Sequence, residues 1–193
     1  MKKVYHIHGR APLFTNTFLL VTEAGHAVAI DPDAPAEKYR QLLEKEGAAL
    51  THILLTHGHH DHVGSVNELR ADGAKLYMNA ADAAHFGIQP DEVYTDGGQI
   101  QVDEDCYTTI FTPGHTPGST CIRCDALLFT GDTLFAGTVG RTDLPGGNYD
   151  QLMDSLKKLC DAVPDDPQVL PGHEDFSTME QEKASNPYLG FAR

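Results

Sequence analysis

Hydrophobic residues along this chain gather in short apolar runs that alternate with longer segments of helical periodicity. Short runs rich in Val, Ile, Leu, Thr, Tyr and Phe predict strands, and they lie at 4–8, 18–22, 26–30, 52–56, 75–79, 99–102, 107–113, 119–124, 126–132 and 168–172. Helices are expected at 35–47, 65–73, 81–85, 150–160 and 178–184. Strands interleaved with helices in this way predict an α/β fold.

Two of the expected helices have explicit end signals. The helix at 35–47 ends at Gly47, a residue that suits the left-handed backbone beyond a helix C-terminus. The helix at 65–73 begins at Ser65, and Glu68 follows three residues later. This spacing is typical of a capping box, so we expect the Ser65 side chain to cap that helix.

Length and composition favour one globular domain over residues 1–193, with 40% hydrophobic and 22% charged residues. No apolar stretch approaches the length of a membrane span, and no apolar segment follows the N-terminal lysines as in a signal peptide. The cysteines at 106, 121, 124 and 160 are too irregular for a disulfide scaffold. We therefore expect a cytoplasmic protein, and interpret Cys121 and Cys124 as ordinary strand packing.

The charge balance bears on possible partners. The net charge is −14, from 14 basic and 28 acidic residues, and no run of Lys or Arg interrupts it. Such a surface repels a phosphate backbone. We expect a small-molecule partner and neither nucleic acid nor membrane.

Residues that commonly bind metals follow four of the expected strands at the point where each ends. HILLT runs into His57, YTTIFTPG into His115, ALLFTG into Asp132 and QVLPG into His173. Strand ends in α/β proteins are where sites are built on rigid support. The four ends are therefore expected to converge on one rim.

The loop after the first of these strands, THGHHDH at 56–62, adds further ligands of the same kind. The full set of candidates is His57, His59, Asp61, His62, His115, Asp132 and His173. Imidazole and carboxylate suit Zn²⁺, Fe or Mn, and an open tetrahedral site takes three protein ligands. Seven candidates thus indicate two metals with one shared carboxylate, and Asp132 is favoured because its two oxygens can reach both.

The other histidines are interpreted as ordinary polar groups. His60 is expected to point away from the metals, because its neighbours His59 and Asp61 already have ligand roles. The remaining ones are His6, His8, His26, His52 and His85.

The motifs as a set resemble the metallo-β-lactamase superfamily. The loop 56–62 is similar to its T-H-x-H-x-D-H signature; 112–119, 129–135 and 171–174 resemble its later motifs in the same order, and Thr15-Asn16 and Asp31-Pro32 match its N-terminal hairpin and turn. The resemblance implies an αββα sandwich, with two mixed sheets face to face and helices outside. It also implies one metal at His57, His59 and His115, and a second at Asp61, His62 and His173, bridged by Asp132.

Within the superfamily, the stretches 131–143 and 182–189 are most similar to short glyoxalase II-type thioester hydrolases. That resemblance implies hydrolysis of S-lactoyl-glutathione or a related acyl-thiol by two divalent ions, zinc first and iron or manganese next. Asp61 or Asp132 would orient the attacking water. Asp31 either supports a ligating imidazole, since such rings commonly donate their other N–H to a carboxylate, or is a simple turn residue before Pro32. Arg141 would attract a substrate carboxylate. An ion pair between Arg141 and Asp143 is the alternative.

Two departures from that pattern matter. Asp33 stands where the family usually has Gly, and we expect it to keep the turn because Asp tolerates left-handed backbone. Only 20 residues follow His173, so the C-terminal helical domain of longer glyoxalase II enzymes is not expected here.

Rival functions differ in the residues they need. A true β-lactamase usually lacks the bridging carboxylate that Asp132 would supply, and nucleases need a surface that accepts phosphates. Persulfide dioxygenases, which use a single iron, have a similar stretch at Gly140–Asp143 and are the main alternative. A metal-binding module without catalysis would require closed coordination.

Overall fold

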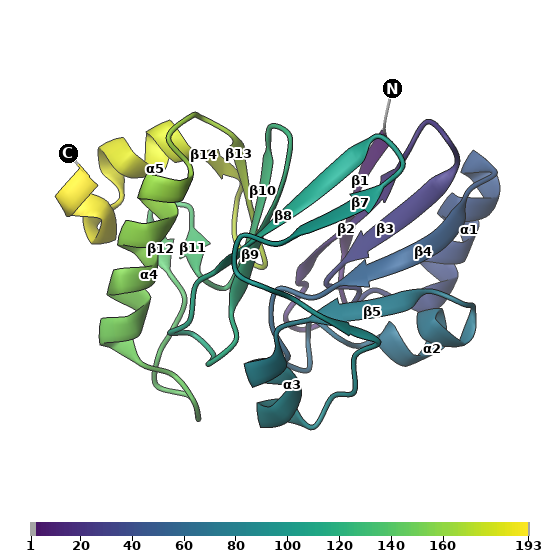
Figure 1. Ribbon diagram of the computed structural model, residues 1–193, viewed down its shortest axis with the longest axis horizontal. Coiled ribbons are helices and arrows are strands. Elements are labelled where there is room, and N and C mark those ends of the chain that lie inside the picture. The colour runs from purple at the N-terminus through teal and green to yellow at the C-terminus, as the bar shows by residue number, and fades with distance from the viewer. Residues whose placement is uncertain (1–2, 193) are drawn as a thin grey trace.

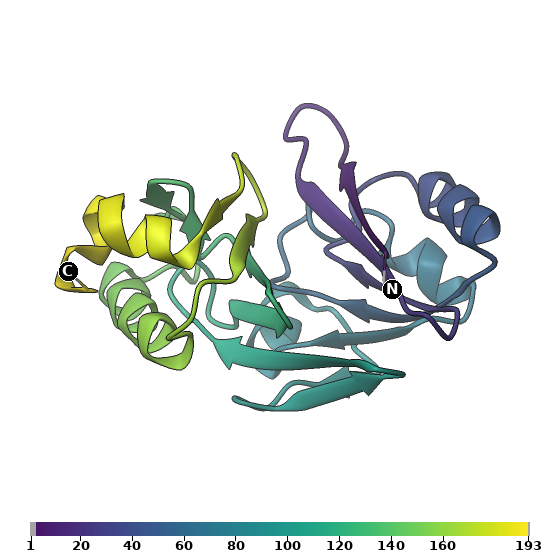
Figure 2. The ribbon, with the colours of Figure 1, turned by 90° about the horizontal axis from the view of Figure 1, so that it is seen from above.

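Two six-stranded sheets pack face to face between outer helices in this computed structural model, which describes residues 3–192 (Figures 1 and 2). Met1 and Lys2, part of the N-terminal segment considered for a signal peptide, lie outside the described residues. The first sheet has the order β1 (Lys3–His8), β2 (Asn16–Val21), β3 (His26–Ile30), β4 (Ala49–Leu54), β5 (Lys75–Met78) and β6 (Glu92–Val93). Its first three strands are antiparallel and the rest follow in parallel, so the sheet is mixed.

The second sheet is mixed as well. Its order is β14 (Ser177–Thr178), β13 (Gln168–Pro171), β10 (Leu127–Gly131), β9 (Thr120–Cys124), β8 (Asp105–Phe111) and β7 (Gln99–Val102). Only β10 and β13 pair in parallel. A separate two-stranded ribbon joins β11 (Leu134–Phe135) to β12 (Thr138–Val139).

Helices form the outer layers. α1 (Ala36–Glu46) and α2 (Val66–Ala71) lie outside the first sheet, whereas α4 (Tyr149–Ala162), α5 (Met179–Ser185) and the 3-10 helix η1 (Pro187–Ala192) lie outside the second (Figure 2). α3 (Ala80–Phe86) stands apart from both layers, at the lower edge of Figure 1. The αββα architecture implied by the motifs is therefore confirmed. No helix among the described residues is long and apolar enough to span a bilayer.

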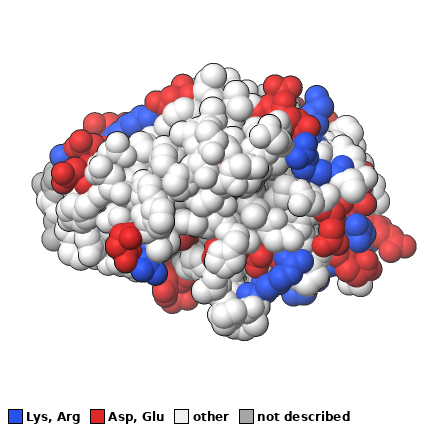
Figure 3. Space-filling model, turned by 90° about the horizontal axis from the view of Figure 1, so that it is seen from below, with Lys and Arg blue, Asp and Glu red and all other residues white. Residues whose placement is uncertain are grey.

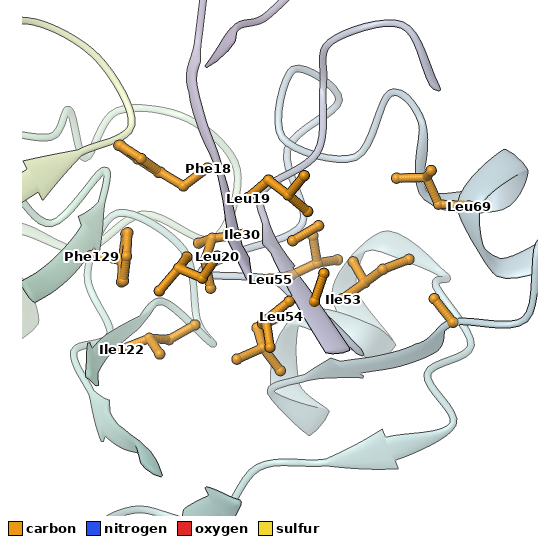
Figure 4. Packing of buried hydrophobic residues seen from close by; sticks show 14 of the residues in the cluster. Phe18, Leu19, Leu20, Ile30, Ile53, Leu54, Leu55, Leu69, Ile122 and Phe129 are labelled. Atoms are coloured by element: carbon orange, nitrogen blue, oxygen red, sulfur yellow. The ribbon is translucent and has the colours of Figure 1, made fainter. Parts of the chain in front are cut away.

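The apolar inner faces of the strands form the hydrophobic core between the two sheets. Side chains from β2 and β4 meet those from β9 and β10 (Figure 4). The rings of Phe18 and Phe129, one from each sheet, lie 5.0 Å apart at an interplanar angle of 61°. Each such buried side chain stabilises the fold by about 1.5–3 kcal/mol relative to exposure.

Two details of the sequence prediction are wrong. The Ser65 side chain does not cap α2; its hydroxyl donates to the Ala34 carbonyl at 2.6 Å and accepts from Arg10 Nη2 at 3.0 Å. The left-handed residue of the turn is Asp31, with φ 46°, and not Asp33. Asp33 instead uses its carboxylate to accept the Arg10 backbone N–H at 2.6 Å. The first error arises because Ala34 and Arg10, which hold the Ser65 hydroxyl, are distant from it in the chain and give no local signal.

Element boundaries differ less. β4 begins three residues before the expected 52, and β8 begins two residues before the expected 107. The short strands β6, β11, β12 and β14 were not expected, because two-residue strands carry no periodic signal. The helix η1 was not expected either.

Candidate metal centre

The four strand ends singled out in the sequence do converge, and the Asp132 carboxylate lies at the point where they meet. Its Oδ1 is 3.4 Å from His62 Nε2. Its Oδ2 is 3.4 Å from His115 Nε2, 3.7 Å from His173 Nε2 and 4.0 Å from His57 Nε2. One carboxylate thus faces histidines from three different loops.

The remaining candidates divide into two groups around Asp132. His57, His59 and His115 form what we call the three-histidine cluster, and their nearest ring nitrogens lie within 4.8 Å of one another. Within it, His59 Nδ1 and His115 Nε2 are 2.9 Å apart.

Asp61, His62 and His173 form the mixed cluster, which meets the same limit of 4.8 Å. Its shortest contact joins His173 Nε2 to Asp61 Oδ2 at 3.1 Å. All seven sequence candidates therefore lie in one centre, in the two groups that the resemblance implied.

Unpartnered polar atoms show that this centre fits metal ions. Several buried side-chain atoms among the described residues have no hydrogen-bond partner, and three of them belong to this centre: His57 Nε2, His62 Nε2 and Asp132 Oδ1. A buried polar group left in this state costs about 1–3 kcal/mol, and such groups are rare in folded proteins. All three atoms face the same centre, and their donor types are those that bind Zn²⁺, Fe or Mn.

In His62 and His115, the ring nitrogen that faces away from the centre has a partner of its own. His62 Nδ1 lies 2.9 Å from Asp31 Oδ2, and the same carboxylate accepts from the Thr56 backbone N–H at 2.7 Å. His115 Nδ1 lies 2.7 Å from the carbonyl oxygen of Arg141. Contacts of this kind fix the ring orientation and tautomer of a ligating histidine. Asp31 therefore lies beside a candidate ligand, and it is also the left-handed residue of its turn.

Electrostatics differ between the two clusters. In the three-histidine cluster, burial lowers the pKa of His59 to about 4, and it holds the pKa of His57 well below its ordinary value. In the mixed cluster, burial also lowers the pKa values of the histidines, but nearby carboxylates raise them by more. The carboxylates of Asp132 and Asp31 raise the pKa of His62 well above its ordinary value, and the hydrogen bond to Asp61 raises the pKa of His173.

Two residues at the N-terminal hairpin have contacts that sequence reasoning missed. The Thr15 hydroxyl donates to Asp61 Oδ2 at 3.2 Å. The Asn16 amide donates to the carbonyls of Pro171 and Glu174 at 3.1 and 3.0 Å, which fixes the loop around His173. The Thr15-Asn16 motif was the available signal, but it gave no indication of what the side chains contact.

A pocket of about 760 Å³ opens over the centre. Its wall is largely apolar and includes Leu13, Phe86, Phe135, Val139, Leu144 and Pro145. Arg141 is the one Lys or Arg among the described residues that line it, and its guanidinium also pairs with Asp143 at 2.7 and 2.8 Å. Both sequence interpretations of Arg141 are thus compatible with its position.

Histidines that were set aside as ordinary polar groups lie mostly elsewhere. His60 is 84% exposed at the pocket mouth, and its ring is not part of either cluster. His26 contacts Asp103, and His6 contacts Asn16. His85 is the exception in position, because it lines the pocket and contacts the Pro145 carbonyl.

The fold and the paired clusters define a class of protein: an αββα sandwich with a histidine- and aspartate-rich centre at its strand ends. The model of the metallo-beta-lactamase superfamily matches residues 10–173. The chain belongs to this superfamily.

Individual proteins in the comparisons narrow the class further. The chain is 34% identical to hydroxyacylglutathione hydrolase GloC of Haemophilus influenzae, over 90% of this chain and 92% of that protein. The solved structure of ETHE1 from Myxococcus xanthus matches with a TM-score of 0.87 and 29% identity, over 97% of this chain and 85% of that one. The structure of TTHA1623 in a di-iron-bound form matches with a TM-score of 0.81 and 33% identity, over 96% and 100%. These relatives support a metallo-hydrolase that binds divalent metals.

Proposed function

We propose that the protein hydrolyses a thioester, S-lactoyl-glutathione or a related acyl-thiol, with two divalent metal ions. The observation that carries the proposal is the pair of three-residue clusters with Asp132 between them, at the base of a pocket. The similarity to a hydroxyacylglutathione hydrolase over nearly the whole chain supports it. Zinc suits these donors, and iron and manganese suit them too.

Each cluster has a role in this proposal. When bound, the metals would supply Lewis-acid activation of water and of the thioester carbonyl. The three-histidine cluster and the mixed cluster would each hold one of them, and Asp132 would reach both through its two oxygens.

Asp61 is placed to orient the attacking water. Its Oδ2 is already fixed by the Thr15 hydroxyl at 3.2 Å and lies 3.1 Å from His173 Nε2. Burial opposes the charge of Asp61, but the hydrogen bond from His173 and the charge of His62 outweigh it and hold the Asp61 pKa below its usual range. An ionised carboxylate in this position can accept a hydrogen bond from water. The thiolate departs readily because a thiol is far more acidic than an alcohol.

Pocket and surface both support a small substrate. The apolar wall of the pocket suits the carbon chain of an acyl-thiol, and Arg141 offers one positive charge for a carboxylate. On the face drawn in Figure 3, Lys and Arg side chains are interspersed with Asp and Glu and do not form one basic patch. This distribution, with the net charge of −14, favours a small molecule over nucleic acid.

One alternative has an observation of its own. The stretch Gly140–Asp143 resembles the corresponding stretch of persulfide dioxygenases. Oxidation of a persulfide at a single iron is therefore the second candidate.

The deciding experiment compares both reactions on the same preparations. Zinc-loaded and iron-loaded proteins are each assayed for hydrolysis of S-lactoyl-glutathione and for oxygen uptake with glutathione persulfide. We expect hydrolysis with both metals and no oxygen uptake. Oxygen uptake that requires iron, without hydrolysis, would replace the proposal with the dioxygenase alternative.

A further inference from the structure

A buried carboxylate outside the seven candidate ligands lies between two of the loops that supply them. Asp82 belongs to α3, and its side chain is fully buried. Sequence patterns gave no indication of a role, since Asp82 stands in the first turn of a short helix, where acidic residues are common. Its hydrogen bonds, however, reach well beyond the helix.

Three donors converge on this carboxylate. The Gly58 backbone N–H and the Thr116 hydroxyl both donate to Oδ2, at 2.9 Å each, and the Gly118 backbone N–H donates to Oδ1 at 2.6 Å. A carboxylate accepts at both oxygens, whereas an asparagine amide would turn a donor toward one set of these groups. The three contacts therefore require Asp specifically.

The positions of the donors in the chain are informative. Gly58 stands between His57 and His59, and Thr116 directly follows His115. One carboxylate thus joins the loop after β4 to the loop after β8, within one residue of every member of the three-histidine cluster. Gly58 shares its loop with His62 but lies four residues before it, and none of the three donors is adjacent in the chain to His62 or His173.

Close packing supports the same connection. A Cβ at Gly118 would lie 2.6 Å from the Asp82 backbone nitrogen, and a Cβ at Gly58 would lie 2.3 Å from the ring of Phe86, also in α3. The Phe86 ring further contacts the His59 ring, with centroids 5.1 Å apart. Both loops therefore press directly on this helix.

We propose that Asp82 is a positioning residue for the three-histidine cluster: its carboxylate sets the distance between the His57–His59 loop and His115. The inference rests on the proposed function, because it assumes that this cluster holds a metal. Loss of the carboxylate would let the two loops separate and would weaken metal binding there, while the mixed cluster would be affected little. Support of this kind changes metal affinity by about 10–100-fold in other metal sites.

The test measures each cluster separately with Co²⁺, whose visible absorption reports its coordination. His173→Ala leaves the three-histidine cluster intact, and His59→Ala leaves the mixed cluster intact. Asp82→Asn is added to each background. We expect about 10–100-fold weaker cobalt binding in the His173→Ala background and less than about a twofold change in the His59→Ala background.

Controls separate positioning from general stability. Glu182→Gln alters another fully buried carboxylate, which accepts from the Gly137 N–H and the Asn186 amide at one oxygen; it should leave cobalt binding by both clusters unchanged. Thr116→Val removes one of the three donors and serves if Asp82→Asn does not fold. It should weaken cobalt binding less than Asp82→Asn does, and again only at the three-histidine cluster.

The outcomes are distinguishable. Wild-type protein that binds no cobalt would overturn the proposed function together with this inference. The inference alone would be overturned if wild-type protein binds two equivalents of cobalt but Asp82→Asn and Thr116→Val leave the affinity of the three-histidine cluster unchanged. It would also be overturned if these variants weaken cobalt binding by both clusters equally.

Discussion

The three-histidine cluster and the mixed cluster lie side by side around Asp132, yet they differ in charge and in support. The first contains only imidazoles, and the pKa values of His57 and His59 are lowered by burial. The second combines carboxylates with imidazoles, and the pKa values of His62 and His173 are raised. Without metal, His57 and His59 are therefore neutral at pH 7, while His62 retains a proton between the carboxylates of the second cluster.

This difference predicts that metal binding depends on pH differently in the two clusters. A metal entering the three-histidine cluster displaces no proton from His57 or His59, so its binding depends little on pH near neutrality. A metal entering the mixed cluster competes with protons at His62 and His173, whose pKa values are raised, so its binding is linked to pH. The two clusters share Asp132, and removing that residue is the strongest way to break the comparison.

The largest effect is expected from Asp132→Ala. Both clusters face this carboxylate at 3.4 Å, so both should lose metal affinity, and activity should fall by at least about a thousandfold. The fold should persist, because the core between the sheets does not include Asp132. Elemental analysis after zinc loading measures the metal content, and circular dichroism measures whether the fold persists.

His60→Ala is the matched control, since it removes an exposed histidine from the same loop as the ligands. It should retain two equivalents of zinc. If Asp132→Ala keeps one full equivalent, the clusters are independent and Asp132 is not shared between them.

The seven candidate ligands could be predicted from sequence for a simple reason. Each follows an apolar strand, and strand ends are fixed by the hydrophobic pattern, which is a local signal. The grouping into two clusters required the resemblance to a known family. The role of Asp31 was left open by the sequence, and the 2.9 Å contact with His62 favours the supporting role.

Other parts of the centre leave no trace in the sequence. The Arg141 carbonyl supports His115, but a backbone acceptor has no residue-type signature. In the sequence, Asp82 has the pattern of an ordinary helical residue. Its contacts with two loops that are distant in the chain are known only from the structure. The failed cap at Ser65 has the same origin, because Arg10 and Ala34 reach it only through tertiary packing.

The second prediction sharpens the contrast in pH dependence. His62 and His173 have raised pKa values, so they gain protons first as the pH falls, and protons compete with metal. Metal affinity of the mixed cluster should drop by about tenfold per pH unit for each proton displaced. His59, with its pKa of about 4, stays neutral over the same range. At about pH 5.5 the protein should therefore retain one equivalent of metal, in the three-histidine cluster.

Cobalt titrations between about pH 5.5 and 7.5 test this order of loss. His173→Ala, which keeps only the three-histidine cluster intact, should show a nearly flat profile. A wild-type protein that releases both metals together, or a His173→Ala protein with a steep profile, would contradict the assignment of protons to the mixed cluster.

The smallest effect is expected at Arg141, on the outer side of the three-histidine cluster. Its carbonyl contacts His115, whereas its guanidinium is 62% exposed and pairs with Asp143. Arg141→Ala removes the guanidinium and keeps the carbonyl, so metal content and kcat should stay unchanged. The KM for S-lactoyl-glutathione should rise by about threefold, as expected when an exposed charge contact common to ground and transition states is lost. Salt should also raise the wild-type KM, because exposed charges are screened.

Asp143→Ala is the matched control: it frees the guanidinium from its partner and should lower KM slightly. If both variants share the wild-type KM, and a small uncharged thioester is turned over with the same kcat/KM, then Arg141 does not bind the substrate and its contribution to the centre is limited to the backbone contact with His115.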